Sequence, residues 1–291
     1  MAPTAIRPSP FRKPTLPLFL TLLIPLFALL SHLSPLPTSS LLPLSGSEDE
    51  VYTDRMTALI LTAHPDDEVM FFSPTVLHLT GLGWDVRGLC LSIGDSQGLG
   101  EKRRKELVES YSVLGVEKGN VEIIDHPYLQ DGMNNYWDEM TVAGLVQDSL
   151  SYHPVDLIIT FDKIGITQHS NHISLPSSLV HLPSPTPRII HLKSPPLLTK
   201  FTGPFYPLYI HLNLLINSVL RSIRSLFPSS GGSSISASTE GMTTMVIVST
   251  PQQYFTSLRA MMAHDSQLVW FRWLYISFSR LMWVNELVLA Q

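Results

Sequence analysis

Short apolar runs alternate with amphipathic stretches along the chain from Thr57 onward. Apolar runs rich in β-branched residues are typical of buried parallel strands, and the stretches between them have helical spacing. The predicted strands cover Thr57–Ala63, Asp85–Ile93, Val121–Asp125, Asp156–Phe161, Arg188–Lys193 and Met242–Ser249, and the predicted helices cover Phe71–Leu82, Glu101–Leu114 and Trp137–Tyr152. This alternation predicts an α/β fold, Rossmann-like, with a mostly parallel sheet and helices on both faces.

The N-terminal residues 1–50 differ from the rest of the chain. From Pro14 to Ser47 there is no Asp, Glu, Lys or Arg, and the apolar stretch has about the ~20 residues that a membrane helix needs. A cleaved signal peptide is the alternative, because Arg7, Arg12 and Lys13 precede the apolar run. The length of the run favours an uncleaved membrane anchor, followed by a catalytic domain over residues 51–291.

Two further stretches interrupt the strand and helix alternation. Phe205 to Phe227 is apolar nearly all round, which predicts either a buried core helix or a helix that lies on a membrane surface. The next stretch, Pro228 to Gly241, is rich in Ser and Gly and predicts a flexible loop.

Composition narrows the class of protein. The formal net charge of −5 argues against nucleic acid as a partner. The single cysteine cannot form an internal disulfide, and no Asn-x-Ser/Thr glycosylation site is present, which disfavours a secreted protein. Basic residues before the apolar stretch and acidic residues after it would place the body of the protein outside the cytosol.

Titratable residues gather at the ends of two predicted strands. His64, Asp66, Asp67 and Glu68 follow the first strand, in "TAHPDDEVMFF". His169 and His172 follow the strand that ends at Phe161. Because the carboxyl ends of neighbouring parallel strands lie at one edge of a sheet, the two groups could form a single site.

His64, Asp67 and His172 would give two imidazoles and one carboxylate, the ligand set of hydrolytic zinc enzymes. Such a metal polarises a carbonyl group and activates water. Asp66 could then act as the general base, and His169 could stabilise or protonate the tetrahedral intermediate. The residues therefore predict metal-assisted hydrolysis of an amide or ester.

The same motifs carry a family resemblance. "TAHPDDEVMFFSPTV" and "TFDKIGITQHSNHISL", with the C-terminal block "MMAHDSQLVWFRWLYISFSRLMWVNEL", resemble the N-acetylglucosaminyl-phosphatidylinositol de-N-acetylases, the PIG-L or LmbE-like zinc-dependent deacetylases. The resemblance implies metal ligands at His64, Asp67 and His172, a general base at Asp66 and an intermediate-stabilising histidine at His169. It also implies a catalytic domain on the cytoplasmic face of the endoplasmic reticulum, contrary to the charge rule above.

Other residues have less definite roles. Arg103 matches an arginine of the family's "GE-x-R" pattern, which implies a contact with the phosphate or inositol of the substrate. Glu68 is expected to support a ligand, and the role of His264 stays open. Many bacterial relatives have aspartate where Asn171 stands, and Asp162 is a candidate to orient His169 in its place.

The expected function is removal of acetate from N-acetylglucosaminyl-phosphatidylinositol, the second step of GPI-anchor biosynthesis, by a membrane-anchored zinc enzyme. Alternatives are deacetylation of another N-acetylglucosaminyl conjugate and a catalytically inactive membrane scaffold. A non-haem iron oxygenase is a further alternative, because His64-Pro65-Asp66 fits a His-x-Asp motif.

Overall fold

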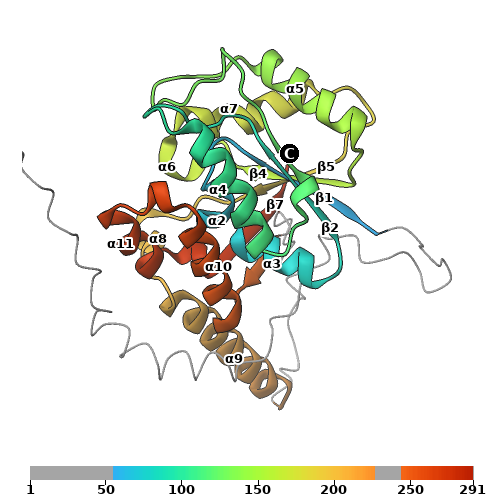
Figure 1. Cartoon of the computed structure of the whole chain (residues 1–291). Helices are drawn as coiled ribbons and strands as arrows, with labels where there is room; N and C mark the ends of the chain where they lie inside the picture. Colours follow the sequence, from blue (N-terminus) through green and yellow to red (C-terminus); the bar gives the residue numbers. More distant parts are fainter. Residues whose placement is uncertain (1–54, 227–243, 291) are drawn as a thin grey trace, which may run out of the picture.

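The computed structural model describes residues 55–226 and 244–290, and a seven-stranded sheet forms the centre of this part of the chain (Figure 1). The strands are β1 (Thr57–Thr62), β2 (Asp85–Cys90), β3 (Val121–Ile123), β4 (Leu157–Phe161), β5 (Arg188–Leu192), β6 (Thr244–Val248) and β7 (Val284–Leu289). Their order is β3-β2-β1-β4-β5-β7-β6. Strands β1 to β5 are parallel, and β7 is antiparallel to both β5 and β6. The α/β prediction is confirmed, with a mixed sheet.

Helices cover both faces of the sheet. Helices α5 (Glu139–Tyr152) and α7 (Ser170–Ser178) pack together on one face, and α3 (Ser73–Gly81), α4 (Gly100–Val113) and α10 (Pro251–Ala263) pack together on the other (Figure 1). The central strands β1 and β4 are therefore almost completely buried. Burial on both faces explains why their sequences are continuous apolar runs rather than alternating ones.

The strand order reverses between β1 and β4, which lie side by side. In open α/β sheets, sites form at such a reversal, beyond the carboxyl ends of the strands. Helix α2 (Asp67–Met70) follows β1, and α6 (Gly165–Gln168) follows β4. The fold therefore brings the two titratable motifs to the same edge of the sheet.

The C-terminal third contains elements that the sequence pattern did not predict. They are α8 (Leu197–Lys200), α10, α11 (Trp270–Phe278) and β7. Short 3-10 turns lie at Lys118–Asn120, Leu179–His181, Asp265–Gln267 and Arg280–Met282. Strand β7 includes the polar residue Asn285, whose side chain is buried and hydrogen-bonds with Phe71 O and Thr75 Oγ1.

Within the predicted stretch, residues Phe205–Leu226 form helix α9, and the buried-core alternative is wrong. Many of its apolar side chains are exposed, including Tyr209, Leu212 and Leu215. The expected N-terminal membrane helix and the Ser/Gly-rich loop lie outside the described residues. Within the described ranges, no helix has the length and apolar character to cross a membrane.

Candidate metal and catalytic site

The turn after β1 holds an unusual backbone conformation. Asp66 has φ 110° and ψ −19°, a backbone conformation that residues other than glycine rarely adopt. Its backbone N–H donates a hydrogen bond to Glu68 Oε2 at 3.0 Å, which helps to hold this turn. Strained residues of this kind cluster at functional sites.

The carboxylate of Asp67 is fixed by two backbone groups. Its Oδ2 accepts hydrogen bonds from the N–H groups of Ala63 at 3.0 Å and His64 at 2.9 Å. Its Oδ1 lies 3.2 Å from His172 Nε2. Burial would raise the pKa of Asp67, but the imidazole of His172 and the contacts with His64 hold the pKa well below its usual range. Asp67 is therefore an ionised carboxylate with one oxygen directed at an imidazole.

The two imidazoles turn one nitrogen each toward the same point. His172 Nε2 lies 3.3 Å from His64 Nδ1. The opposite nitrogens are held by other groups: His172 Nδ1 is 3.1 Å from Gly165 O, and His64 Nε2 is 2.9 Å from Asn171 Oδ1. Phe161 stacks on His172, with ring centroids 4.1 Å apart.

These donors fit a divalent metal. The ligand atoms of His64, Asp67 and His172 lie within 4.8 Å of one another, and all three side chains are buried. Two imidazole nitrogens and a carboxylate oxygen are the donor set of catalytic zinc sites. Metal-bound histidines usually donate their other ring N–H to an oxygen, as Gly165 O and Asn171 Oδ1 could accept here.

Asp131 was not predicted from the sequence. Its Oδ1 lies 3.3 Å from His64 Nε2 and 3.7 Å from His169 Nε2. His64, Asp131 and His169 also form a second cluster with closely spaced ligand atoms. The only sequence signal was its place in the loop that leaves β3 at the same edge of the sheet as the other motifs.

His169 is the most exposed of the three histidines, with 14% of its side chain accessible, compared with 7% for His64 and 4% for His172. Its Nδ1 accepts a hydrogen bond from the backbone N–H of Asn171 at 3.2 Å, so the ring hydrogen of neutral His169 is on Nε2, toward Asp131. Burial, together with the nearby His64 and His172, lowers the pKa of His169 to about 4. The imidazole is therefore neutral near pH 7 and offers an N–H donor.

Asp162, the candidate for orienting His169, binds other groups. The Asp162 carboxylate instead accepts hydrogen bonds from the backbone N–H of Ser194 at 2.7 Å and from Ser194 Oγ at 2.6 Å. It also accepts one from the backbone N–H of Gly165 at 3.1 Å. Asp162 therefore fixes the loop that carries Gly165, the acceptor for His172.

Arg103 is buried beneath the β1 turn. Its guanidinium donates to Gly94 O at 2.7 Å and to Pro65 O at 2.6 Å. It also lies 3.8 Å from Asp66 Oδ2 and 3.7 Å from Asp131 Oδ2. Gly94 allows this approach, because a Cβ there would lie 2.3 Å from Arg103 Nη1. Arg103 thus joins the loops that carry the two acidic residues.

Helix α11 contributes a second arginine, which no sequence motif indicates. Arg272 Nη2 lies 2.5 Å from Asp66 Oδ2, and its Nη1 contacts Met70 Sδ. Burial raises the pKa of Asp66, while Arg272 and Arg103 oppose that rise. The proposed base is therefore a buried carboxylate held by two guanidinium groups.

Glu68 and His264 form a buried pair under the site. His264 Nε2 lies 2.6 Å from Glu68 Oε1, and both side chains are completely buried. Ser110 Oγ donates to the same oxygen at 2.5 Å. Since the other oxygen of Glu68 accepts from the Asp66 N–H, the pair supports the strained turn. The structure thus gives His264 a structural role.

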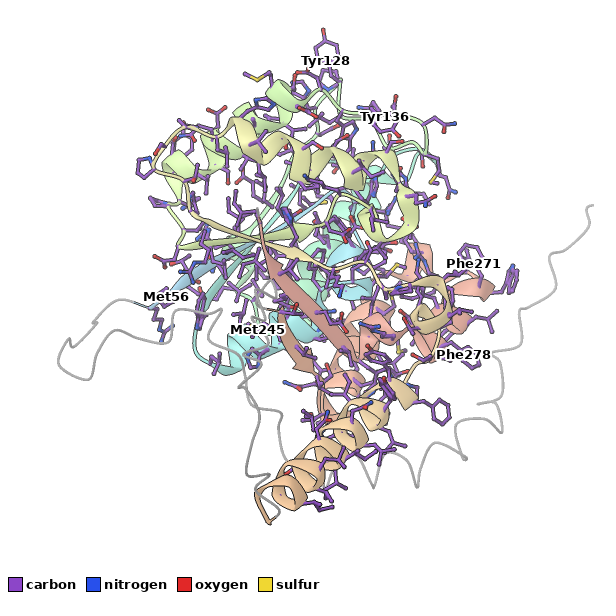
Figure 2. All side chains as sticks on the ribbon, turned by 180° about the vertical axis from the view of Figure 1, so that it is seen from behind. Met56, Tyr128, Tyr136, Met245, Phe271 and Phe278 are labelled. Atoms are coloured by element: carbon purple, nitrogen blue, oxygen red, sulfur yellow. The ribbon has the colours of Figure 1, made fainter. Side chains whose placement is uncertain are left out.

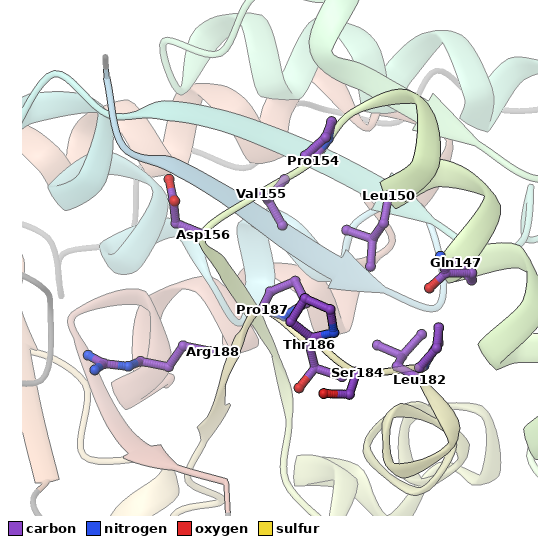
Figure 3. A pocket seen from close by; sticks show the side chains of 12 residues that line it. Gln147, Leu150, Pro154, Val155, Asp156, Leu182, Ser184, Thr186, Pro187 and Arg188 are labelled. Carbon is purple, nitrogen blue, oxygen red and sulfur yellow. The ribbon is translucent and has the colours of Figure 1, made fainter. Parts of the chain in front are cut away.

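The cavity in Figure 3 lies elsewhere in the molecule. It has a volume of about 450 Å³ and is lined by residues around the amino ends of β4 and β5, including Asp156 and Arg188. The Asp156 carboxylate accepts a hydrogen bond from the backbone N–H of Thr57 at 2.8 Å. This cavity holds none of the residues of the candidate site.

Known proteins are similar to this chain over most of its length. The sequence pattern of the family described as PIG-L, GlcNAc-PI de-N-acetylase, matches residues 59–181. The N-acetylglucosaminyl-phosphatidylinositol de-N-acetylase of Bos taurus is 35% identical over 234 residues, which cover 79% of this chain and 81% of the relative. The enzyme of the same name from Saccharomyces cerevisiae is 30% identical and is covered to 81%.

Solved structures show the same fold. The N,N'-diacetylchitobiose deacetylase from Pyrococcus horikoshii superposes with a TM-score of 0.52 at 15% identity, over 81% of this chain and 84% of that chain. A deacetylase from the teicoplanin biosynthesis pathway gives a TM-score of 0.51 at 12% identity. At this identity the likeness shows the fold alone.

Proposed function

The chain belongs to the PIG-L family of GlcNAc-PI de-N-acetylases, and we propose from this premise how its residues carry out the reaction. It is an amide hydrolase that removes the acetyl group from N-acetylglucosaminyl-phosphatidylinositol in GPI-anchor biosynthesis. One observation carries the proposal for the site: His64, Asp67 and His172 bring their ligand atoms together at the carboxyl edge of the sheet. The iron oxygenase and the inactive scaffold are set aside, because the family is one of deacetylases.

His64, Asp67 and His172 would hold the metal, which we take to be zinc. When bound, such a metal polarises the amide carbonyl and lowers the pKa of its water to about 7. The fixed outer nitrogens of His64 and His172 keep both rings oriented toward this point. Phe161 and Phe71 pack against His172 and limit its movement.

Asp66 is the proposed general base. It follows His64 closely in the turn and precedes the ligand Asp67, so its carboxylate belongs to the same loop. Asp66 accepts a proton from the attacking water, the hydroxyl oxygen bonds to the acetyl carbon, and the proton then passes to the departing nitrogen. The C–N bond breaks, which gives acetate and a free amine. Arg272 and Arg103 hold the Asp66 carboxylate in place through both steps.

His169 is the proposed donor to the oxygen that becomes negative during the reaction. Its Nε2–H is available because Nδ1 accepts from the backbone of Asn171. Asp131, beside that Nε2 and beside His64, limits the orientations of the ring. Such hydrogen-bond donors stabilise an oxyanion only when they are positioned before the reaction begins.

We also propose that the enzyme acts at the cytoplasmic face of the endoplasmic reticulum membrane, anchored by its N-terminal apolar segment. The absence of glycosylation sites and the lipid substrate of the relatives support this placement. A glycosylation site engineered into the stretch 229–239 should stay unmodified in cells. Efficient glycosylation there would contradict the cytoplasmic placement.

The experiment for the proposed function uses the purified full chain in vesicles that contain N-acetylglucosaminyl-phosphatidylinositol. Mass spectrometry should show conversion to the glucosaminyl lipid, and the His172→Ala variant should show none. N,N'-diacetylchitobiose serves as a competing substrate, and its preferential cleavage would support a deacetylase of another N-acetylglucosaminyl conjugate instead.

A further inference from the structure

Exposed large apolar side chains gather on helices α8, α9 and α11. Leu198 on α8 is 92% exposed, and Trp270 on α11 is 75% exposed. The other members are Leu197, Phe201, Phe205, Tyr209, Leu212, Leu214, Leu215, Ile216, Val219, Leu220, Ile223, Phe271, Trp273, Leu274 and Phe278. Figure 2 shows Phe271 and Phe278 directed away from the body of the protein. We call this set the apolar surface.

Contacts join the helices of the apolar surface to one another. A Cβ at Gly203, between α8 and α9, would lie 3.0 Å from Ser277 O, so this turn packs closely on the end of α11. At the start of α9, Tyr206 donates to Glu286 at 3.0 Å, and Arg280 lies 3.7 Å over its ring. Tyr206 therefore fixes the inner side of α9 to β7, while apolar side chains such as Leu212 and Leu215 remain exposed.

The Lys, Arg, Asp and Glu residues in the stretches that form this surface are all basic. The sequence contains no Asp or Glu in residues 194–239 or 266–285, the two stretches that contain α8, α9 and α11. The basic residues there include Lys200 on α8 and, near the end of α9, Arg221 and Arg224. Arg272 and Arg280 are not counted, because they pair with Asp66 and Glu286 inside the protein. An apolar surface with basic and no acidic residues complements the hydrocarbon and headgroups of an anionic bilayer.

The apolar surface also adjoins the catalytic site. Helix α11 turns Arg272 and Tyr275 inward, where they contact Asp66 and Met70 O. On its outward side it presents Trp270, Phe271 and Leu274. Lys200 of α8 donates to Ile166 O at 3.1 Å, in the loop next to Gly165. One helix therefore separates the proposed base from the exposed apolar side chains.

We propose that α8, α9 and α11 form a membrane-docking surface that rests on an anionic phospholipid bilayer, separately from the N-terminal segment. The inference rests on the proposed function, because the acyl chains of a phosphatidylinositol substrate stay in the bilayer while its sugar must reach the site. Tryptophan and tyrosine are favoured at the boundary between lipid and water, as Trp270 and Tyr209 would be here. The surface holds the mouth of the site at the headgroups.

Tryptophan fluorescence tests the docking without any assay of activity. Residues 1–83 contain no tryptophan, so the N-terminal segment gives no signal. Full-length protein is reconstituted in vesicles of phosphatidylcholine and phosphatidylserine, with or without bromine on the acyl chains, which quenches nearby indoles. Brominated lipid should quench wild type, and the double variant Trp270→Phe/Trp273→Phe should lose most of that quenching.

The control is Trp84→Phe, which removes a partly buried tryptophan on another part of the fold and should leave the quenching as in wild type. Absence of quenching in wild type, or equal fractional quenching in the double variant, overturns the proposal. So does a dimer in sedimentation that Leu198→Glu dissociates, because the surface would then bind a second copy of the chain.

Activity gives an independent test. Leu198→Glu should lower turnover of vesicle-bound glycolipid about tenfold, because a charged group replaces a large apolar one at the interface. It should leave turnover of the same sugar-inositol phosphate without acyl chains unchanged. Tyr152→Glu, at the end of α5 and away from α11 in Figure 1, is the matched control and should affect neither substrate.

Two failures can be told apart. Equal loss of turnover on both substrates in Leu198→Glu contradicts the docking surface and leaves the proposed function intact. If wild type cleaves neither substrate, the proposed function fails, while the quenching result still decides whether the surface binds lipid.

Discussion

The buried pair of Glu68 and His264 allows a quantitative prediction. Both side chains are 0% exposed, and their nearest atoms are 2.6 Å apart. Replacing His264 by alanine leaves the Glu68 carboxylate in the interior with only Ser110 Oγ and the Asp66 N–H as donors. Breaking a buried ion pair on one side costs about 3–5 kcal/mol of stability. We therefore expect the free energy of unfolding of His264→Ala to be about 3–5 kcal/mol lower than that of wild type.

Calorimetry of the full chain in detergent micelles measures the effect. For a domain of this size about 1 kcal/mol lowers Tm by about 2–4 °C, so a drop of about 6–20 °C is expected. Removing both charges in Glu68→Gln/His264→Gln should cost less than the sum of the two single changes, because neither charge is then left unpaired. Exposed His153→Ala is the control and should leave Tm unchanged.

The pH dependence provides a further check. Burial alone would lower the pKa of His264, but Glu68 raises it above the usual value of 6.5. Stabilisation from a raised histidine pKa is fully present below the unfolded value and is lost as pH rises through the folded value. The difference in stability between wild type and His264→Ala should thus be larger near about pH 6 than near about pH 9. A loss below about 1 kcal/mol at both pH values would show that the Glu68–His264 pair does not stabilise the fold.

Three further predictions concern the site itself. His172→Ala should lose bound metal and turnover together, as measured by elemental analysis, whereas His153→Ala should keep both; full metal content in His172→Ala would reject the ligand assignment. Asp66→Asn should keep its metal and lose turnover by about 10²-fold to 10⁴-fold, the usual contribution of a general base; loss of metal would show that Asp66 is a ligand. Asp131→Asn should keep the fold and lower turnover about tenfold or more, because the rings of His169 and of the proposed ligand His64 lose a carboxylate that orients them; unchanged kinetics would show that Asp131 has no role in the reaction.

The strands of the sheet and the two titratable motifs could be predicted from the sequence, because both appear as patterns of neighbouring residues. Buried parallel strands appear as apolar runs, and His64, Asp67 and His172 follow two such runs that end at one edge of the sheet. The partners of His64 Nε2 could not be predicted, because Asn171 in α7 and Asp131 in a loop meet only in the folded chain.

Long-range contacts explain the remaining omissions. Arg272 reaches Asp66 across 206 positions of sequence, and the apolar helix that carries it gives no sign of an inward-facing arginine. Strand β7 was missed because Asn285 and Glu286 make it look polar. The Asn285 side chain donates a hydrogen bond to Phe71 O, and Glu286 Oε1 forms an ion pair with Arg280 Nη2 at 2.6 Å. A polar residue can lie in a central strand only when such partners exist, and the sequence does not reveal them.

The most direct test of the account measures acetate and free amine from N-acetylglucosaminyl-phosphatidylinositol in the same reaction. Purified full-length protein is stripped of metal with a chelator, assayed, and then assayed again after addition of Zn²⁺. We expect no product from stripped protein, equal amounts of acetate and amine after Zn²⁺, and none from His172→Ala under either condition. Equal product from stripped and Zn²⁺-treated wild type, or full activity of His172→Ala, would contradict it.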